Sequence, residues 1–107
     1  MELEDLDELT DDNFNNKEKG MKYILYFTAS WCGPCKQIYP FLCDINKKSD
    51  NINIYKIDVD NNDILTGKFK ISSMPTFIFI KNKQHVDTLV GSDTITLTNH
   101  IIKNFKN

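Results

Sequence analysis

Two cysteines separated by only two residues lie in the segment Trp31-Cys32-Gly33-Pro34-Cys35-Lys36. This segment joins a dense apolar stretch, Lys22–Thr28, to an amphipathic one, Pro34–Ser49. The β-branched and aromatic residues of the first stretch predict a strand buried on both faces, and the helical spacing of apolar residues in the second predicts a helix. The two thiols are therefore expected where a buried strand ends and a helix begins, a junction at which α/β folds usually place their sites.

The remaining hydrophobic pattern predicts three more strands and two more helices. In chain order these are the alternating strand Asn51–Val59, the short helix Asn61–Phe69, the strands Thr76–Ile80 and Gln84–Val90, and a final helix that begins after Asp93 or Thr94. This order combines a parallel crossover with a terminal antiparallel hairpin. It predicts an α/β fold in which a mixed central sheet carries helices on both faces. A chain of 107 residues is expected to form one domain, residues 1–107.

The first twenty residues are the least regular part of the sequence. Leu3, Leu6 and Leu9 recur every third residue, which suits either a short helix or an irregular edge strand. Asp11 or Asp12 is expected to cap a short helix over residues 13–19, which ends at Gly20.

The spacing of the two cysteines allows them to close a small disulfide ring across the start of a helix. Cys32 would lie beside unpaired N–H groups at the positive end of the helix dipole, and both effects lower the pKa of a thiol. Cys35, one turn further along, is expected to be more buried and less acidic. Pro34 suits the first helical turn because its missing N–H costs nothing there, and Gly33 leaves space beside the sulfur.

Two other interpretations of this cysteine pair are less specific. The cysteines could be inert core residues, or they could bind zinc, which usually takes four ligands. His85 and His100 lie far along the chain without ligand-like spacing, so no metal site is predicted. The third cysteine, Cys43, lies away from the apolar side of its helix and is expected to be partly exposed. It is interpreted either as an incidental free thiol or as a redox-regulatory or dimer-forming cysteine.

Charge and hydropathy exclude several classes of function. The 13 cationic residues are all lysines, and against 15 acidic residues they give a net charge of −2, which argues against nucleic acid and anionic membranes as partners. The longest apolar runs are too short to span a bilayer. The acidic start of the chain is the opposite of a signal peptide, so a cytosolic location is expected if no leader precedes it.

With these residues in view, the chain resembles the thioredoxin family over nearly its whole length. The resemblance rests on Leu9–Phe14, the WCGPCK motif with Pro40 behind it, Lys56 and Asp60, the Ser73–Phe77 segment, and Gly91. It implies the thioredoxin fold, a cis bond between Met74 and Pro75, and a protein disulfide reductase that acts in electron transport and cell redox homeostasis.

The resemblance also implies roles for individual residues. Cys32 would be the nucleophile and Cys35 the resolving thiol, with no bound cofactor. Reducing equivalents would come from a flavin-containing, NADPH-dependent thioredoxin reductase, and the substrates would be proteins with disulfides. The substrate-binding surface would consist of Trp31, Gly33, Pro34, Met74, Pro75, Val90 and Gly91. A monomer is expected, with a dimer through Cys43 as the alternative.

One departure from the family concerns the strand before the motif, where Tyr26 stands in place of the usual buried aspartate. A phenol is neutral at pH 7 and does not accept a proton as a carboxylate does. Lys56, which normally approaches that acid, would lack its partner. These two residues are expected to tune the resolving step, unless Tyr26 merely fills the core. An altered redox poise would favour an oxidase or isomerase, and a binding module that uses the fold is a further alternative.

Overall fold

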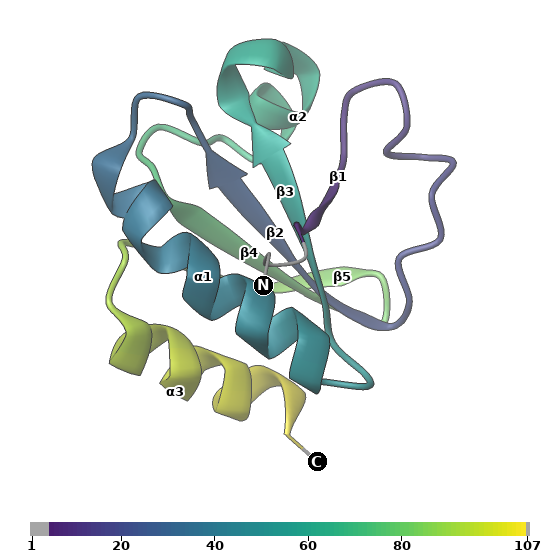
Figure 1. Ribbon diagram of the computed structural model, residues 1–107. Helices are drawn as coiled ribbons and strands as arrows, with labels where there is room; N and C mark the ends of the chain where they lie inside the picture. Colours follow the sequence, from purple (N-terminus) through teal and green to yellow (C-terminus); the bar gives the residue numbers. More distant parts are fainter. Residues whose placement is uncertain (1–4, 107) are drawn as a thin grey trace.

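A five-stranded mixed sheet forms the centre of the computed structural model, which describes residues 5–106 (Figure 1). The elements are β1 (Asp7–Glu8), β2 (Lys22–Thr28), α1 (Gly33–Lys48), β3 (Asn53–Asp58), the 3₁₀ turn η1 (Val59–Asn61), α2 (Asp63–Lys68), β4 (Thr76–Lys81), β5 (Gln84–Val90) and α3 (Thr94–Phe105). The strand order is β1-β3-β2-β4-β5. Strand β3 pairs in parallel with β1 and β2, whereas β4 is antiparallel to β2 and β5. The predicted mixed sheet is confirmed.

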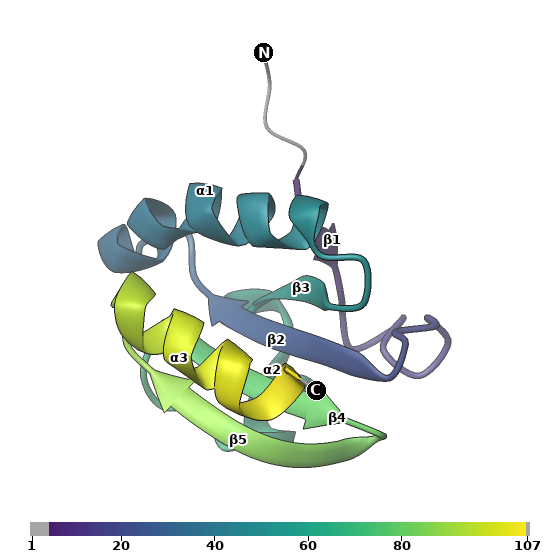
Figure 2. The ribbon, with the colours of Figure 1, turned by 90° about the horizontal axis from the view of Figure 1, so that it is seen from below.

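The two faces of the sheet are covered by different helices, as expected (Figures 1 and 2). Helices α1 and α3 share one core layer with Ile24 and Tyr26 of β2. Helix α2 and the N-terminal segment share the opposite layer with Leu25 and Phe27. Because successive side chains of a strand point to opposite faces, β2 supplies both layers and is almost completely buried. The end of β2 is thereby held rigidly, and the segment with the two cysteines follows it directly.

Helix α1 begins at Gly33, one residue earlier than predicted, and continues through Pro40 without interruption. The expectation that Cys43 is partly exposed is wrong, because only 6% of this residue is accessible to solvent. The segment around Leu6 covers that side of the helix, and the Cys43 thiol interacts with the Tyr39 hydroxyl and the backbone N–H of Leu6. Burial raises the pKa of the Cys43 thiol. A disulfide between two copies would therefore require this thiol to leave the core.

The predicted helix over residues 13–19 does not form, and turns occupy this part of the chain. The backbone N–H of Thr10 donates to the Asn13 side chain over 2.8 Å, and the N–H of Asn13 donates back to the Thr10 hydroxyl over 3.1 Å. These reciprocal bonds satisfy the local backbone in a turn and so compete with a helix. Leu6 and Leu9 are buried next to the short edge strand β1, in agreement with the edge-strand alternative, whereas Leu3 lies outside the described residues.

Asp11, expected to cap that absent helix, instead caps α2. Its carboxylate accepts the backbone N–H groups of Ile64 and Leu65 at 3.1 and 2.9 Å. The residue that precedes α2, Asn62, makes no side-chain cap of its own. Its buried amide instead accepts the N–H of Asp11 and donates to the carbonyl of Asp58. The N-terminal segment is thus fastened to the start of α2, on the same side of the molecule as η1.

A half-buried carboxylate on β5 fastens α3 to the sheet. Asp87 Oδ2 accepts hydrogen bonds from Asn104 at 2.7 Å and from His100 at 2.6 Å, and the side chain is 14% exposed. Burial alone would raise the pKa of Asp87, but these hydrogen bonds outweigh it and hold the pKa below its usual value. A group whose pKa is lowered by folding stabilises the protein above its unfolded pKa, about 3.9. That contribution is lost as the pH falls through the lower, folded value.

We therefore expect Asp87→Ala to lower the free energy of unfolding at pH 7 by about 1–3 kcal/mol, because buried donors lose their charged acceptor. This loss of stability in the variant should become smaller as the pH falls below the unfolded pKa of an aspartate and through the lower, folded pKa of Asp87. Urea unfolding of wild type and variant at pH 7 and pH 3 measures both effects. Asp44→Ala, which removes an exposed partner of Lys48, is the control and should change little. An equal deficit at both pH values would contradict the titration argument.

Candidate redox site

Cys32 and Cys35 are joined by a disulfide at the start of α1. A turn closed by the hydrogen bond from the N–H of Cys32 to the carbonyl of Ala29, 3.1 Å long, leads from β2 into the helix. Cys32 is the N-cap residue, and its Sγ accepts the backbone N–H of Cys35 at 3.2 Å. Cys35 is completely buried, and Cys32 is 5% exposed. The predicted order of burial is confirmed, and the two sulfurs lie at the positive end of the helix.

The second segment of the expected site lies between α2 and β4. The Met74–Pro75 bond is cis, as the family resemblance implies. The carbonyl of Pro75 accepts the backbone N–H of Gly91 at 3.0 Å, so the start of β4 is fastened to the end of β5. Gly91 adopts a φ of +121°, a conformation that side chains rarely allow. This loop packs against the core layer that contains both cysteines, through the side chain of Met74.

The seven residues expected to contact substrates differ in exposure. Trp31 and Val90 are 65% and 58% exposed, and Gly33 and Pro34 are also exposed. Met74 and Gly91 are half-buried, and Pro75 is buried. Most of the exposed apolar area in this set therefore comes from Trp31 and Val90, which lie beside the start of α1 and at the end of β5.

The sequence interpretation gave no role to the contact that orients Trp31. The indole Nε1 donates to Asp60 Oδ2 at 3.0 Å, from the 3₁₀ turn that follows β3. In the sequence, Asp60 is recognisable only through the family resemblance. Because the partners are 29 residues apart, only the pairing of β3 with β2 brings them together. The exposed tryptophan is thus held by one hydrogen bond across two elements.

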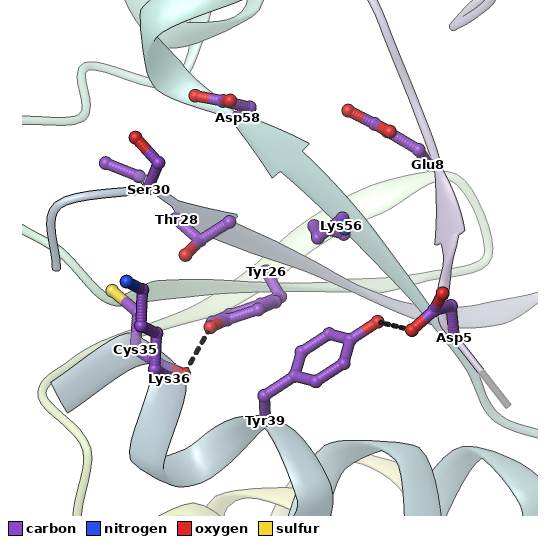
Figure 3. A pocket seen from close by; sticks show the side chains of 11 residues that line it. Asp5, Glu8, Tyr26, Thr28, Ser30, Cys35, Lys36, Tyr39, Lys56 and Asp58 are labelled. Atoms are coloured by element: carbon purple, nitrogen blue, oxygen red, sulfur yellow. Dashed lines mark hydrogen bonds between the residues drawn. The ribbon is translucent and has the colours of Figure 1, made fainter. Parts of the chain in front are cut away.

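A cavity of about 330 Å³ lies behind Cys35, between α1, β3 and the N-terminal segment (Figure 3). Its walls include Cys35, Tyr26, Tyr39 and Lys56, with the carboxylates of Asp5, Glu8 and Asp58 also lining it. Tyr39 follows Cys35 by one helical turn, and this spacing alone could have predicted that the two side chains are neighbours. The cavity therefore lies against the buried side of Cys35 and brings charged and polar side chains close to it.

Tyr26 is 1% exposed and contacts the cysteine pair through the helix backbone. Its hydroxyl donates to the carbonyl oxygen of Cys35 over 2.7 Å (Figure 3), and its ring stacks on Phe77 with centroids 5.4 Å apart. Burial raises the pKa of Tyr26, against a smaller opposite effect of a hydrogen bond with Thr28. The residue therefore fills the core and also binds the first turn of α1, as a neutral phenol.

Lys56 forms no salt bridge within residues 5–106. Its ammonium lies 5.5 Å from the centroid of the Tyr39 ring. The Tyr39 hydroxyl donates to Asp5 Oδ1 over 3.1 Å and accepts the N–H of Leu6 over 3.0 Å. Burial, with a smaller contribution from Asp5, raises the pKa of Tyr39 to about 12. At neutral pH neither phenol beside Cys35 is a proton acceptor.

Within the described part of the chain, no group of three or more His, Cys, Asp or Glu side chains is arranged so that it could hold a metal ion. No helix among these residues is long and apolar enough to cross a membrane.

Comparison with known proteins agrees with this geometry. The family model described as Thioredoxin matches residues 5–104. Thioredoxin H-type 1 of Nicotiana tabacum is 42% identical over 80 residues, which are 75% of this chain and 64% of that protein. Thioredoxin H-type of Ricinus communis is 41% identical over 88 residues, which cover 82% of this chain and 74% of the relative. The chain thus spans about two-thirds to three-quarters of the length of these plant relatives.

Solved structures give the same result over a larger share of the fold. Reduced Schistosoma mansoni thioredoxin pre-protein superposes with a TM-score of 0.82 at 35% identity, covering 95% of this chain and 100% of that one. Chlamydomonas reinhardtii thioredoxin f2 superposes with a TM-score of 0.86 at 26% identity, covering 95% and 98%. Family model, relatives, fold and disulfide geometry agree. The chain belongs to the thioredoxin family and is a thiol–disulfide oxidoreductase.

Proposed function

We propose that this chain reduces protein disulfides through the Cys32–Cys35 pair as a single, monomeric thioredoxin domain. The observation that carries the proposal is the position of Cys32 Sγ at the N-cap of α1, with Cys35 buried one turn behind it. A sulfur at this position accepts backbone N–H groups and lies in the positive field of the helix, so its thiolate form is stabilised.

The reaction transfers two electrons from the dithiol to a substrate disulfide. The Cys32 thiolate attacks one substrate sulfur, forms a mixed disulfide and releases the other substrate sulfur as a thiolate, which takes up a proton. Cys35 then loses its proton and attacks Cys32 Sγ. The second substrate thiol leaves, and the enzyme retains the Cys32–Cys35 disulfide.

Substrates would bind over Trp31, Gly33, Pro34, Met74, Pro75, Val90 and Gly91. The exposed apolar side chains of Trp31 and Val90 support this assignment, because they offer contact area with little specific chemistry. Reducing equivalents would come from an NADPH-dependent flavin thioredoxin reductase in the cytosol, without a cofactor bound to this chain.

Tyr26 and Lys56 would tune the resolving step. Since the two phenols beside Cys35 stay protonated at neutral pH, the proton of Cys35 would pass to water in the cavity behind it. Lys56 would place a positive charge at this cavity, which favours the thiolate of Cys35 over its neutral form.

The reduction potential of the Cys32–Cys35 pair tests the direction of the reaction. We expect a reducing value near that of thioredoxins, about −270 mV, measured against thiol buffers in a Cys43→Ser background.

Tyr26→Asp in the same background is the matched variant for the resolving step. It should shorten the lifetime of the mixed disulfide and shift the pH profile of its resolution, because it restores a proton-accepting group. A strongly oxidising wild-type value would favour an oxidase or isomerase, and unchanged mixed-disulfide kinetics would exclude the tuning role of Tyr26.

A further inference from the structure

A second cavity, of about 490 Å³, lies at the opposite end of β2 from the cysteine pair. Tyr23, at the start of β2, lies in its wall, as do Ile80 near the end of β4 and Phe69 just after α2. Tyr23 lies five positions before Thr28, where β2 ends, which corresponds to about 16 Å in an extended strand. Neither cysteine of the pair lines this cavity, so it takes no part in the proposed disulfide chemistry.

The charge of this cavity is opposite to that of the whole chain. Lys17, Lys19, Lys68 and Lys83 line it, together with a single carboxylate, Glu18. The protein carries a net charge of −2, so an excess of lysines at one site is not a consequence of composition. Lys17 pairs with Asp7 at 3.4 Å, but Lys19, Lys68 and Lys83 form no salt bridge within residues 5–106.

Two of these ammonium groups are held against the same aromatic ring. Lys19 Nζ lies 4.4 Å and Lys68 Nζ 5.0 Å from the centroid of Phe14. Lys19 Nζ also donates to the carbonyl oxygens of Phe14 and Lys17, at 2.5 and 3.0 Å. Lys19 is therefore fixed in place, and two of its three N–H groups have acceptors among the described residues. Burial lowers the pKa of Lys19, and Lys68 lowers it further against the opposite effect of Glu18.

The charge of Lys68 acts on Lys19 and lowers its pKa, so the two ammonium groups repel each other, and a bound anion would offset that repulsion. Lysine binds phosphate as a point charge, and the chain has no arginine for bidentate binding. The rest of the wall combines the aromatic and apolar side chains of Tyr23, Phe69 and Ile80 with the polar residues Asn15 and His85. The volume of the cavity falls in the range of small-molecule sites. We propose that this cavity binds a small organic phosphate, with the phosphate on Lys19, Lys68 and Lys83 and the organic part against Tyr23 and Phe69.

Calorimetric titration and backbone amide NMR of the full chain at low salt test this site, with ATP, tripolyphosphate and adenosine as probes. ATP should bind and shift the amide signals of residues 14–20, 68–69 and 83–85. Tripolyphosphate should bind more weakly because it lacks a ring, and adenosine should not bind because it lacks charge. Lys68→Gln with Lys83→Gln should weaken ATP binding at least about tenfold, since each lost charged hydrogen bond costs about that factor.

Lys47→Gln with Lys48→Gln, in the last turn of α1, changes the net charge equally and is the matched control. It should leave ATP affinity unchanged, and both double variants should reduce a protein disulfide at the wild-type rate, which shows that they are folded. The proposal is overturned if ATP causes no shifts in this cavity at millimolar concentration. It is also overturned if the control variant loses as much affinity, or if tripolyphosphate binds as tightly as ATP.

Discussion

Cys32→Ser should abolish the reduction of protein disulfides, with a loss of roughly 10³-fold or more, the scale usual when a nucleophile is removed. A serine hydroxyl at the N-cap stays protonated near neutral pH and cannot form a mixed disulfide. Cys35→Ser should also stop turnover, but for a different reason. Its Cys32 would still attack a substrate, and the mixed disulfide would persist because the resolving thiol is absent. Reduction of insulin measures turnover, and non-reducing electrophoresis detects the trapped complex.

Cys43→Ser is the natural control, because it removes the remaining thiol without touching the pair. It should retain wild-type activity. Trapping by Cys32→Ser instead of Cys35→Ser would reverse the two assigned roles. A Cys32→Ser, Cys35→Ser double variant that kept its cellular function would show that the chain acts as a binding module.

Tyr26→Ala should lower the free energy of unfolding by about 3–5 kcal/mol, the range for removal of a large buried aromatic side chain. The variant loses the stack on Phe77 and leaves a void beside the existing cavity behind Cys35. It also removes the hydroxyl that binds the first turn of α1. Urea unfolding followed by circular dichroism gives the difference.

Tyr26→Phe separates the two contributions, because it keeps the ring and removes only the hydroxyl. We expect a loss of about 1 kcal/mol, the usual net value of one hydrogen bond. If Tyr26→Phe were as unstable as Tyr26→Ala, the hydrogen bond to Cys35 and not the packing of the ring would dominate. If both variants matched the wild type, Tyr26 would not support α1 at all.

The central part of the fold was predictable because its signals are local. The apolar run of β2, the amphipathic pattern of α1 and the alternation in β3 each specify an element from its own residues. The cysteine spacing likewise specifies where the disulfide lies, since both sulfurs belong to one helix start. In β2, α1 and β3, the secondary structure that the local residues favour is the one that the folded protein adopts.

The errors concern residues whose surroundings come from distant parts of the chain. Cys43 looks exposed on an isolated helix, and only the segment around Leu6 buries it. Asp11 has the chemistry of a helix cap, but the N–H groups that it accepts belong to Ile64 and Leu65, more than fifty positions later in the chain. The cluster of lysines around Phe14 is drawn from separate segments, so no stretch of sequence is basic enough to reveal it.

The attachment of Asp87 to α3 has a further consequence for the outer margin of the sheet. Among the described strands, β5 has a neighbour on one side only, and such an edge is a template on which another chain can add a strand. The Asp87 side chain points from this edge strand toward α3, so its charge faces the interior of the molecule. In addition, the register of β4 and β5 shifts between Phe79 and Ile80. An inward charge and a local irregularity both make a strand a poor template for intermolecular pairing. The same carboxylate that fastens a helix therefore also protects the molecule against aggregation through its open edge.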